Sequence, residues 1–317
     1  MKEQKIKIKP IMGKTIKVFA PATVANLVCG FDVLGLALQQ PQDLMTVRLC
    51  KDPGISIQHT DDYNLPTEPA KNVAGAALLA MLEEINEPPG FEISIEKCIK
   101  PGSGLGSSAA SSAGIVVAAN QLLGSPFSNE DLVRFAMNGE KVASGVKHAD
   151  NIAPCIYGGI TIIRSIFPLD IVQLEYPPLY VTVVHPQIEV RTADARQILR
   201  KEVLLKNAIK QWGNIAGLVA GFMKKDYALI GRSLEDIIIE PVRSILIPGF
   251  DDVKNGSKEA GALGGGISGS GPSIFMLSKE EKEAREVETV MTDVYTKLGI
   301  DFKVYVTGIS KEGVCYE

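Results

Sequence analysis

Residues Pro101-Gly102-Ser103-Gly104-Leu105-Gly106-Ser107-Ser108-Ala109-Ala110 decide how this chain is interpreted. They follow a segment, 91–99, whose alternating apolar and polar side chains predict a strand, and they open a run of small residues, 107–123, that predicts a buried helix. Glycine lets backbone N–H groups come close to an anion, and a helix N-terminus favours negative charge. The serines at the helix start add hydroxyls that suit phosphate oxygens or a hydrated cation. The stretch therefore predicts a phosphate-binding loop.

Outward from this loop, strands and helices are mixed without strict alternation, which favours an α+β fold over a doubly wound sheet. A chain of 317 residues is expected to form two domains, and the proline-rich stretch 167–178 marks the boundary, giving domains 1–172 and 173–317. The expected strands are 15–20, 44–50, 54–58, 91–99, 158–166, 179–185, 273–278 and 301–308. The expected helices are 72–85, 107–123, 128–144, 193–223, 227–239, 252–262 and 281–298.

Composition excludes several classes of protein. The 33 basic and 37 acidic residues give a net charge of −4 without blocks of one sign, so we expect no nucleic-acid or membrane-surface partner. The uncharged stretch 101–129 is too rich in serine, glycine and proline for a lipid-facing helix. The five cysteines are scattered, which favours reduced thiols over disulfides or a zinc site. With no signal peptide visible, the expected location is the cytoplasm.

Three glycine patterns resemble nucleotide motifs of other folds. Gly13-Lys14-Thr15 ends like a P-loop, but the required earlier glycine is replaced by Ile8. Residues 264–269 match G-x-G-x-x-G, but they follow a predicted helix and precede a predicted strand, the reverse of the dinucleotide fingerprint. Residues 104–109 match its G-x-G-x-x-A form in a better context but lack the repeated strand–helix unit. An NAD-dependent enzyme therefore remains only a remote alternative.

Three segments together resemble the GHMP kinase superfamily of galacto-, homoserine, mevalonate and phosphomevalonate kinases. They are residues 21–35, 101–112 and 264–273, which span nearly the whole chain. The resemblance implies a two-domain α+β GHMP kinase fold. Its N-terminal domain, of the ribosomal protein S5 domain 2-like type, carries the first two segments, and a ferredoxin-like C-terminal domain carries the third. The active site then lies between the domains, and the glycines of all three segments are expected to approach phosphate or substrate.

Within that superfamily the resemblance is to the homoserine kinase family. Residues 26–35 are similar to its A-N-L-G-x-G-F-D-x-L-G signature and residues 148–159 to its H-x-D-N-x-A-P-x-x-x-G-G, and 184–196 and 240–250 also match. This implies ATP-dependent phosphorylation of the L-homoserine hydroxyl to O-phospho-L-homoserine for threonine synthesis, and it implies a homodimer. One departure is Val28-Cys29, where the family has a small pair, so the shape of this loop and the accessibility of Cys29 are open.

The resemblance also implies roles for individual residues. Guanidinium groups can grip the substrate carboxylate, and an aspartate can hold its ammonium group. The implied substrate-binding residues are Asn26, Asp32, His148, Asn151, Thr192, Arg196 and Arg243, of which Asp32, Asn151 and Arg196 are assigned catalytic importance. The implied ATP-binding residues are Pro101, Gly102, Ser103, Gly104, Leu105, Gly106, Ser107, Ser108, Ala109, Ala110 and Ser111, with Asn72 and Val73 at the adenine. Ser108 and Glu140 are the implied ligands of Mg²⁺.

Two questions stay open from the sequence. Asp32 is expected to bind the ammonium group, although an equivalent aspartate acts as a base in some relatives. A mevalonate- or sugar-type GHMP kinase is the nearest alternative function, but a neutral sugar gives the two arginines no carboxylate to hold. A non-catalytic amino-acid or nucleotide sensor on the same fold is the second alternative, and it would not need to retain Ser108 and Glu140 as metal ligands.

Overall fold

The computed structural model describes residues 5–8, 13–190 and 192–317. In these residues a seven-stranded sheet has the order β11-β1-β2-β4-β3, with β5 paired to β2 and β6 paired to β5. Its strands are β1 (Thr15–Ala25), β2 (Leu34–Cys50), β3 (Ile55–His59), β4 (Gly90–Glu96), β5 (Ile160–Ile166), β6 (Leu169–Leu174) and β11 (Cys315–Tyr316). The helices that accompany it are α1 (Val73–Leu82), α2 (Ser107–Leu122), α3 (Asn129–Ser144) and α4 (Ile152–Tyr157).

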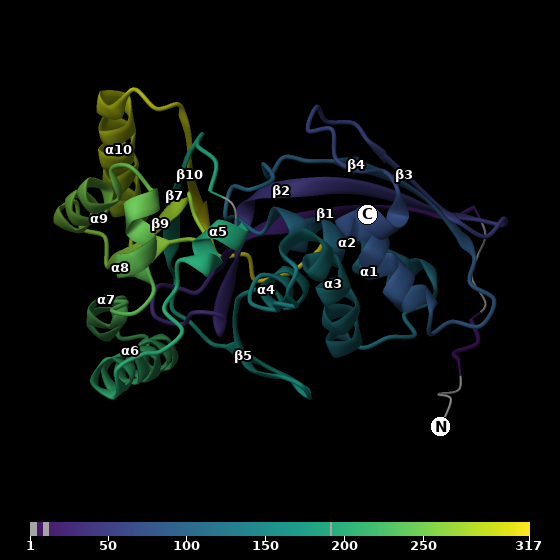
Figure 1. The fold of residues 1–317 in the computed structure, drawn as a ribbon, viewed down its shortest axis with the longest axis horizontal. Helices are drawn as coiled ribbons and strands as arrows, with labels where there is room; N and C mark the ends of the chain where they lie inside the picture. The colour runs from purple at the N-terminus through teal and green to yellow at the C-terminus, as the bar shows by residue number, and fades with distance from the viewer. Residues whose placement is uncertain (1–4, 9–12, 191) are drawn as a thin grey trace.

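A second, four-stranded sheet has the order β10-β7-β9-β8 and lies in the other half of the elongated molecule (Figure 1). Its strands are β7 (Tyr180–Pro186), β8 (Gly264–Ile267), β9 (Ile274–Ser278) and β10 (Phe302–Gly308). The remaining helices are α5 (Thr192–Gln197), α6 (Leu205–Lys224), α7 (Tyr227–Ser233), α8 (Glu240–Arg243), α9 (Phe250–Glu259) and α10 (Glu281–Leu298). The α+β fold expected from the sequence is confirmed.

Helix α2 connects the fold to the glycine loop. Its first turn begins directly after Gly106, and most of its small side chains are buried. A side chain at Gly114 would lie 3.4 Å from the Cβ of Ala20 and 3.5 Å from the Cε of Met45, so the helix lies close against β1 and β2. Because this helix is packed on several sides, its start is held in a fixed position. The predicted buried helix is confirmed, as is the predicted cap at Ser128.

Several predicted elements were wrong in their boundaries. Residues 264–267, for which no element was predicted, form strand β8, where an added Cβ on Gly265 would collide with the carbonyl oxygen of Phe275 in β9. The expected helix 193–223 is interrupted between α5 and α6. Helix α7 ends at Ser233 rather than at 239, because the Asp236 carboxylate accepts the backbone N–H groups of residues 238–240 and so competes with the helix.

The proline-rich stretch 167–178 contains strand β6, which pairs with β5. The expected boundary after residue 172 therefore cuts through a strand of the first sheet. At the other end of the chain, Cys315–Tyr316 returns to pair with β1. The chain therefore passes between the two sheets twice, after β6 and after β10, and the division into residues 1–172 and 173–317 remains a prediction. None of the helices in the described ranges is both long and apolar enough to cross a membrane.

Candidate active site

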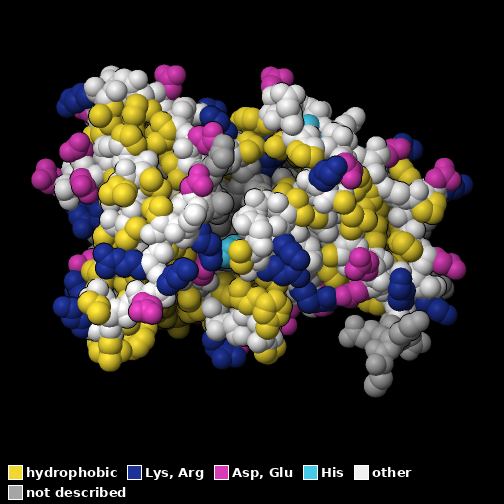
Figure 2. Space-filling model, in the orientation of Figure 1, with side chains coloured by type: hydrophobic (Ala, Val, Ile, Leu, Met, Phe, Trp, Pro, Cys, Tyr) yellow, Lys and Arg dark blue, Asp and Glu magenta, His cyan; other side chains and the backbone are white. Residues whose placement is uncertain are grey.

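A cleft of about 900 Å³ is lined by residues from both halves of the molecule. Figure 2 shows the hollow near the centre of this face, with a histidine and basic side chains at its edge. The cleft collects most of the side chains that the sequence singled out. They are Asn26, Asp32, Val73, Pro101, Gly102, Ser103, Gly104, Gly106, Ser107, Ser108, Ser111, Glu140, His148, Asn151, Arg196 and Arg243.

Four predicted residues do not line this cleft. Leu105, Ala109 and Ala110 are buried beneath the loop, where they pack in the core and support its shape. Asn72 is also buried, at the cap of α1. The side chain of Thr192, at the start of α5, lies outside the part of the chain that the structure describes.

Two serines from the second half of the molecule fix the conformation of the glycine loop. Gly102, Gly104 and Gly106 all have positive φ, between 67° and 78°, which favours glycine. The Ser268 hydroxyl donates to the Gly104 carbonyl at 2.7 Å, and the Ser273 hydroxyl donates to the Ser103 carbonyl at 2.6 Å. These bonds occupy two carbonyl oxygens that would otherwise repel a phosphate. The loop can therefore present N–H groups to an anion.

The third glycine segment thus has a different function from the one expected. Its Ser268 and Ser273 hold the loop, while its first glycines allow strand β8 to pack tightly. An added Cβ on Gly266 would collide with the Glu240 carboxylate, and one on Gly264 would lie 2.9 Å from the Cβ of Leu234. Gly264, Gly265 and Gly266 do not line the cleft, whereas Gly269 and Ser270 do, so the expectation that the glycines of this segment approach phosphate or substrate remains a prediction for Gly269 alone.

Ser108 and Glu140 meet across the start of α2. The Ser108 hydroxyl donates to Glu140 Oε2 at 2.7 Å. Burial raises the pKa of the Glu140 carboxyl, and this hydrogen bond only partly offsets it. A buried carboxylate beside a hydroxyl in an anion-binding cleft fits a hard divalent cation. Among the described residues no three His, Cys, Asp or Glu side chains form a metal-binding group, so phosphate oxygens and water would complete its coordination.

The loop between β1 and β2 presents Asp32. Asn26 fixes this loop, because its side-chain oxygen accepts the Asp32 N–H at 3.0 Å and its side-chain nitrogen donates to the Gly269 carbonyl at 3.0 Å. The Asp32 carboxylate accepts from Arg196 Nη2 at 2.8 Å and lies 3.6 Å from His148 Nδ1. Burial lowers the pKa of His148, while Asp32 raises it and the two nearby arginines lower it further. Asp32, Arg196 and His148 therefore form one half-buried polar group.

Arg243 lies behind this group and is fixed from two sides. Its Nε donates to the Ala195 carbonyl at 2.9 Å, and Nη1 donates to the Gly269 carbonyl at 3.0 Å. Its guanidinium also lies 4.9 Å from the centre of the Phe31 ring. Burial and the charge of Arg196 lower its pKa from the usual arginine value. Two guanidinium groups thus converge on one end of the cleft, which suits a carboxylate.

Asn151 connects the glycine loop to the substrate end. It precedes helix α4, and its side-chain oxygen accepts from the Thr23 hydroxyl at 2.8 Å. Its neighbour Asp150 also lines the cleft and was not singled out from the sequence. Burial, followed by the negative charges of Asp32 and Glu140, raises the pKa of Asp150 to about 7. The sequence signal was its place inside the 148–159 motif, but its burial depends on the fold.

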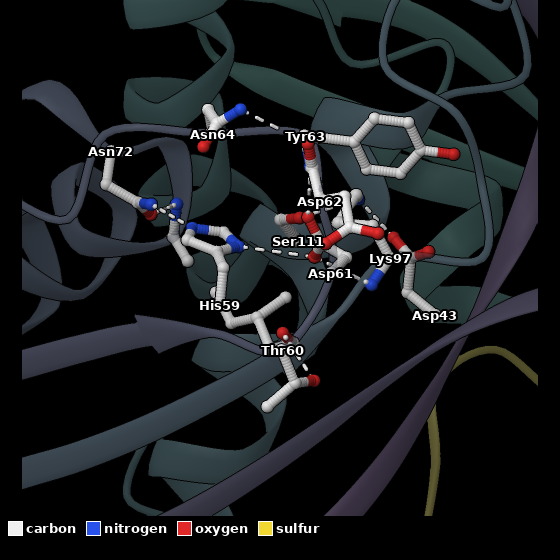
Figure 3. A network of polar contacts seen from close by, with 12 residues as sticks. Asp43, His59, Thr60, Asp61, Asp62, Tyr63, Asn64, Asn72, Lys97 and Ser111 are labelled. Carbon is white, nitrogen blue, oxygen red and sulfur yellow. Dashed lines mark hydrogen bonds and ion pairs between the residues drawn. The ribbon is translucent and has the colours of Figure 1, made fainter.

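Asn72 is not available for the adenine contact that the resemblance implied. Its side-chain oxygen accepts the N–H groups of Ala74 and Gly75, which caps α1. Its side-chain nitrogen donates to the Pro66 carbonyl at 2.6 Å and contacts His59 Nε2 at 3.1 Å (Figure 3). An amide has two N–H donors and two acceptor lone pairs, so all are used. Asn72 instead positions Val73 and Pro66, which line the cleft.

Figure 3 also shows Lys97, a cleft residue that the sequence analysis missed. Its buried ammonium group pairs with Asp43 and donates to the Ser107 carbonyl at 2.7 Å and to the Ser111 hydroxyl at 2.9 Å. Asp43 in turn accepts the N–H groups of Cys98 and Ile99 at 2.8 Å. The pair fixes the start of α2 against β2, and nothing in the local sequence marks its long-range partner.

The Val28-Cys29 pair, which departs from the family's small pair, gives the loop a strained backbone at Val28 and a buried thiol at Cys29. Val28 has a φ of 67°, a conformation that favours glycine and strains a β-branched side chain. Cys29 is buried, and burial raises the pKa of its thiol to about 12. A thiol with such a pKa stays protonated near neutral pH and is unreactive. Cys29 is not among the residues that line the cleft, so it is not a site of thiol modification.

Comparison with known proteins agrees with this geometry. The family model described as "GHMP kinases N terminal domain" matches residues 72–159, and "GHMP kinases C terminal" matches residues 218–297. A homoserine kinase of Chloroherpeton thalassium is 45% identical, over 95% of this chain and 98% of that protein. One of Pyrococcus furiosus is 39% identical, over 93% and 98%.

Solved structures extend the comparison. The crystal structure of homoserine kinase from Cytophaga hutchinsonii has a TM-score of 0.93 and 49% identity, covering 98% of this chain and 99% of that one. The L. major mevalonate kinase has a TM-score of 0.73 at 15% identity, covering 95% and 98%, and shows the shared fold alone. Fold and cleft together define a GHMP kinase. Within that class the chain belongs to the homoserine kinase family.

Proposed function

We propose that the protein transfers the γ-phosphoryl group of ATP to the side-chain hydroxyl of L-homoserine, giving O-phospho-L-homoserine and ADP. One observation carries the proposal: a glycine loop at a helix N-terminus shares a single cleft with an aspartate and two arginines. The first part suits a triphosphate, and the second suits an amino acid. The reaction belongs to threonine biosynthesis, and the proposal includes a cytoplasmic homodimer, as the family resemblance implies.

ATP would lie along the α2 side of the cleft. Leu65, Pro66, Val73 and Val142 give this side an apolar wall that suits the adenine ring. The triphosphate would reach the N–H groups of Ser107 and Ser108 at the start of α2, where the positive end of the helix favours negative charge; the N–H groups of Ser103 and Leu105 already donate within the loop. Asn72 supports this wall from behind through its bond to the Pro66 carbonyl.

Mg²⁺ would be held by Ser108 and Glu140. When bound, the ion neutralises charge that develops on the phosphate oxygens during transfer. The protein's contribution is to keep one carboxylate and one hydroxyl together at the end of the glycine loop, 2.7 Å apart. A divalent ion would also compensate the buried negative charge of Glu140, whose pKa burial raises.

L-homoserine would bind between Asp32 and Arg196 and replace the ion pair that they form in the free protein. Its ammonium group matches the Asp32 carboxylate, and its carboxylate matches Arg196 together with Arg243, so one ion pair is exchanged for two. The side-chain hydroxyl would then point toward Asn151, which lies beside Gly106. Positioning of the hydroxyl against the γ-phosphate supplies most of the catalysis in phosphoryl transfer. Because Asp32 is occupied by the ammonium group, the γ-phosphate itself accepts the proton.

An ADP-release assay tests the function directly. We expect ADP release with ATP and L-homoserine at a kcat/KM at least 100-fold above that with mevalonate, galactose or L-threonine, because only an amino acid matches both Asp32 and the arginines. Preference for mevalonate or galactose would contradict the proposal in favour of a different GHMP kinase. Nucleotide binding without ADP release in any of the four would indicate a sensor.

Asp32→Asn separates ammonium binding from base catalysis. We expect the KM for L-homoserine to rise about 100-fold, corresponding to about 2.7 kcal/mol, while kcat at saturating homoserine changes less than about fivefold. Steady-state kinetics with saturating ATP measure both constants. Asp62→Asn, at an exposed position, changes the net charge equally and should leave both unchanged. A large fall in kcat at saturating substrate would instead make Asp32 the base.

A further inference from the structure

The predicted phosphate cradle contains no cation of its own. Residues 101–108 are all uncharged. Of the charged side chains near them, Glu140 and Asp150 are acidic, and Lys97 is buried and paired with Asp43. The triphosphate of ATP carries about four negative charges near neutral pH, more than one divalent ion and a helix N-terminus neutralise. A further cation is therefore needed beside the loop.

The cations that line the described part of the cleft are mostly committed. Lys97 is buried against Asp43, and Arg196 pairs with Asp32. Lys71 is exposed, and its 2.6 Å contact with Glu68 is a weak surface pair. Arg243 donates to two carbonyl oxygens at the substrate end. Lys100 is different. It directly precedes the loop, and its ammonium group donates to a neutral acceptor, Gln187 Oε1, at 2.9 Å.

The orientation of Gln187 is fixed by its own neighbour. Its Nε2 donates to the His185 carbonyl at 3.0 Å and lies 3.2 Å from His185 Nδ1. Burial, with the charges of Lys100 and Lys303, lowers the pKa of His185 to about 4, so the ring is neutral near pH 7 and its Nδ1 can accept from Gln187 in the tautomer that carries the proton on Nε2. The Lys100 ammonium group can only donate, so it requires an oxygen of Gln187 as its partner. The amide nitrogen therefore faces His185 and the amide oxygen faces Lys100. Gln187 holds the lysine without neutralising it.

We propose that Lys100 is a phosphate-binding residue of the nucleotide site, held by Gln187 in the free protein and donating to a β- or γ-phosphate oxygen when ATP or ADP is bound. The inference rests on the proposed function for its ligand. A charged phosphate oxygen is a stronger acceptor for an ammonium group than a neutral amide. Because Lys100 precedes the loop and Gln187 follows β7 of the second sheet, the exchange would also release a contact across the cleft.

Calorimetric titration of Lys100→Met with ATP, ADP and adenosine tests the proposal. We expect the Kd for ATP and ADP to rise at least tenfold, while the Kd for adenosine stays within twofold of wild type because adenosine carries no phosphate. Lys100→Arg should recover part of the ATP affinity. Lys303→Met is the matched control: Lys303 faces His185 across the β7–β10 pair, is exposed and does not line the cleft. It should bind all three ligands as the wild type does.

Gln187→Ala tests whether Lys100 binds phosphate or only stabilises the fold through its contact with Gln187. If Lys100 acts on phosphate, this variant keeps ATP affinity within about threefold of wild type. If Lys100→Met and Gln187→Ala weaken ATP and adenosine binding alike, the contact is structural and the proposal is wrong. Unchanged ATP binding by Lys100→Met would also overturn it. Wild-type protein that binds no ATP would contradict the proposed function instead, and Lys100→Met protein that still binds adenosine has kept its fold.

Discussion

Gly106→Ala is expected to remove most of the activity and to destabilise the protein. Gly106 has a φ of 67°, and an added Cβ would collide with the Thr23 hydroxyl and lie 3.0 Å from Asn151 Oδ1. We expect a loss of about 2–5 kcal/mol in the free energy of unfolding, from left-handed backbone strain together with overpacking. The kcat/KM for ATP should fall about 100-fold or more, because the start of α2 and Asn151 both shift.

Two glycines provide matched controls for this variant. Gly102 and Gly124 also have positive φ, 75° and 85°, but an added Cβ on either meets no atom within 4 Å. Gly124→Ala, beyond the end of α2, should cost about 1–2 kcal/mol from strain alone and leave kcat/KM unchanged. Gly102→Ala adds the same strain within the loop. Urea unfolding and steady-state kinetics compare the three, and equal losses at Gly106 and Gly124 would contradict the collision argument.

The sequence predicted the parts of the site that depend on local pattern. Glycine spacing followed by a small-residue helix identified the loop and α2, because conformation at Gly104 and Gly106 and burial of α2 both follow from residue type. The family motifs then brought Asp32, Arg196 and Arg243 together, and the structure places them within one cleft. Their roles toward substrate remain proposals, tested by the kinetics above.

Features that depend on tertiary neighbours were not predictable. Gly264-Gly265-Gly266 matches part of a nucleotide motif but forms strand β8, where Gly265 and Gly266 are needed because β9 and Glu240 leave no room for side chains. Asn72 matches a ligand position, yet its amide is used within the protein, which only the placement of His59 and Pro66 shows. Lys97 and Asp43 lie 54 residues apart, so their buried pairing depends on the pairing of β2 with β4.

Asp150→Asn is expected to stabilise the protein above neutral pH while lowering its activity. Burial and the charges of Asp32 and Glu140 raise the pKa of Asp150 from 3.8 to about 7. Between these values the folded protein holds a proton that the unfolded chain has released, so the free energy of unfolding falls as pH rises through this window. About three pKa units correspond to a penalty of at most about 4 kcal/mol, which is fully present above pH 7.

The neutral asparagine avoids this penalty, so the stability difference between variant and wild type should be small at pH 4 and grow up to pH 8. Thermal unfolding without ligands measures it, and exposed Asp62→Asn should show a difference that does not change with pH. A constant difference for Asp150→Asn would contradict the burial argument. Asp150 weakens the fold above neutral pH and lines the cleft, so we expect its carboxylate to contribute to activity rather than to stability. We therefore expect kcat/KM for L-homoserine to fall in the same variant that unfolds at higher temperature.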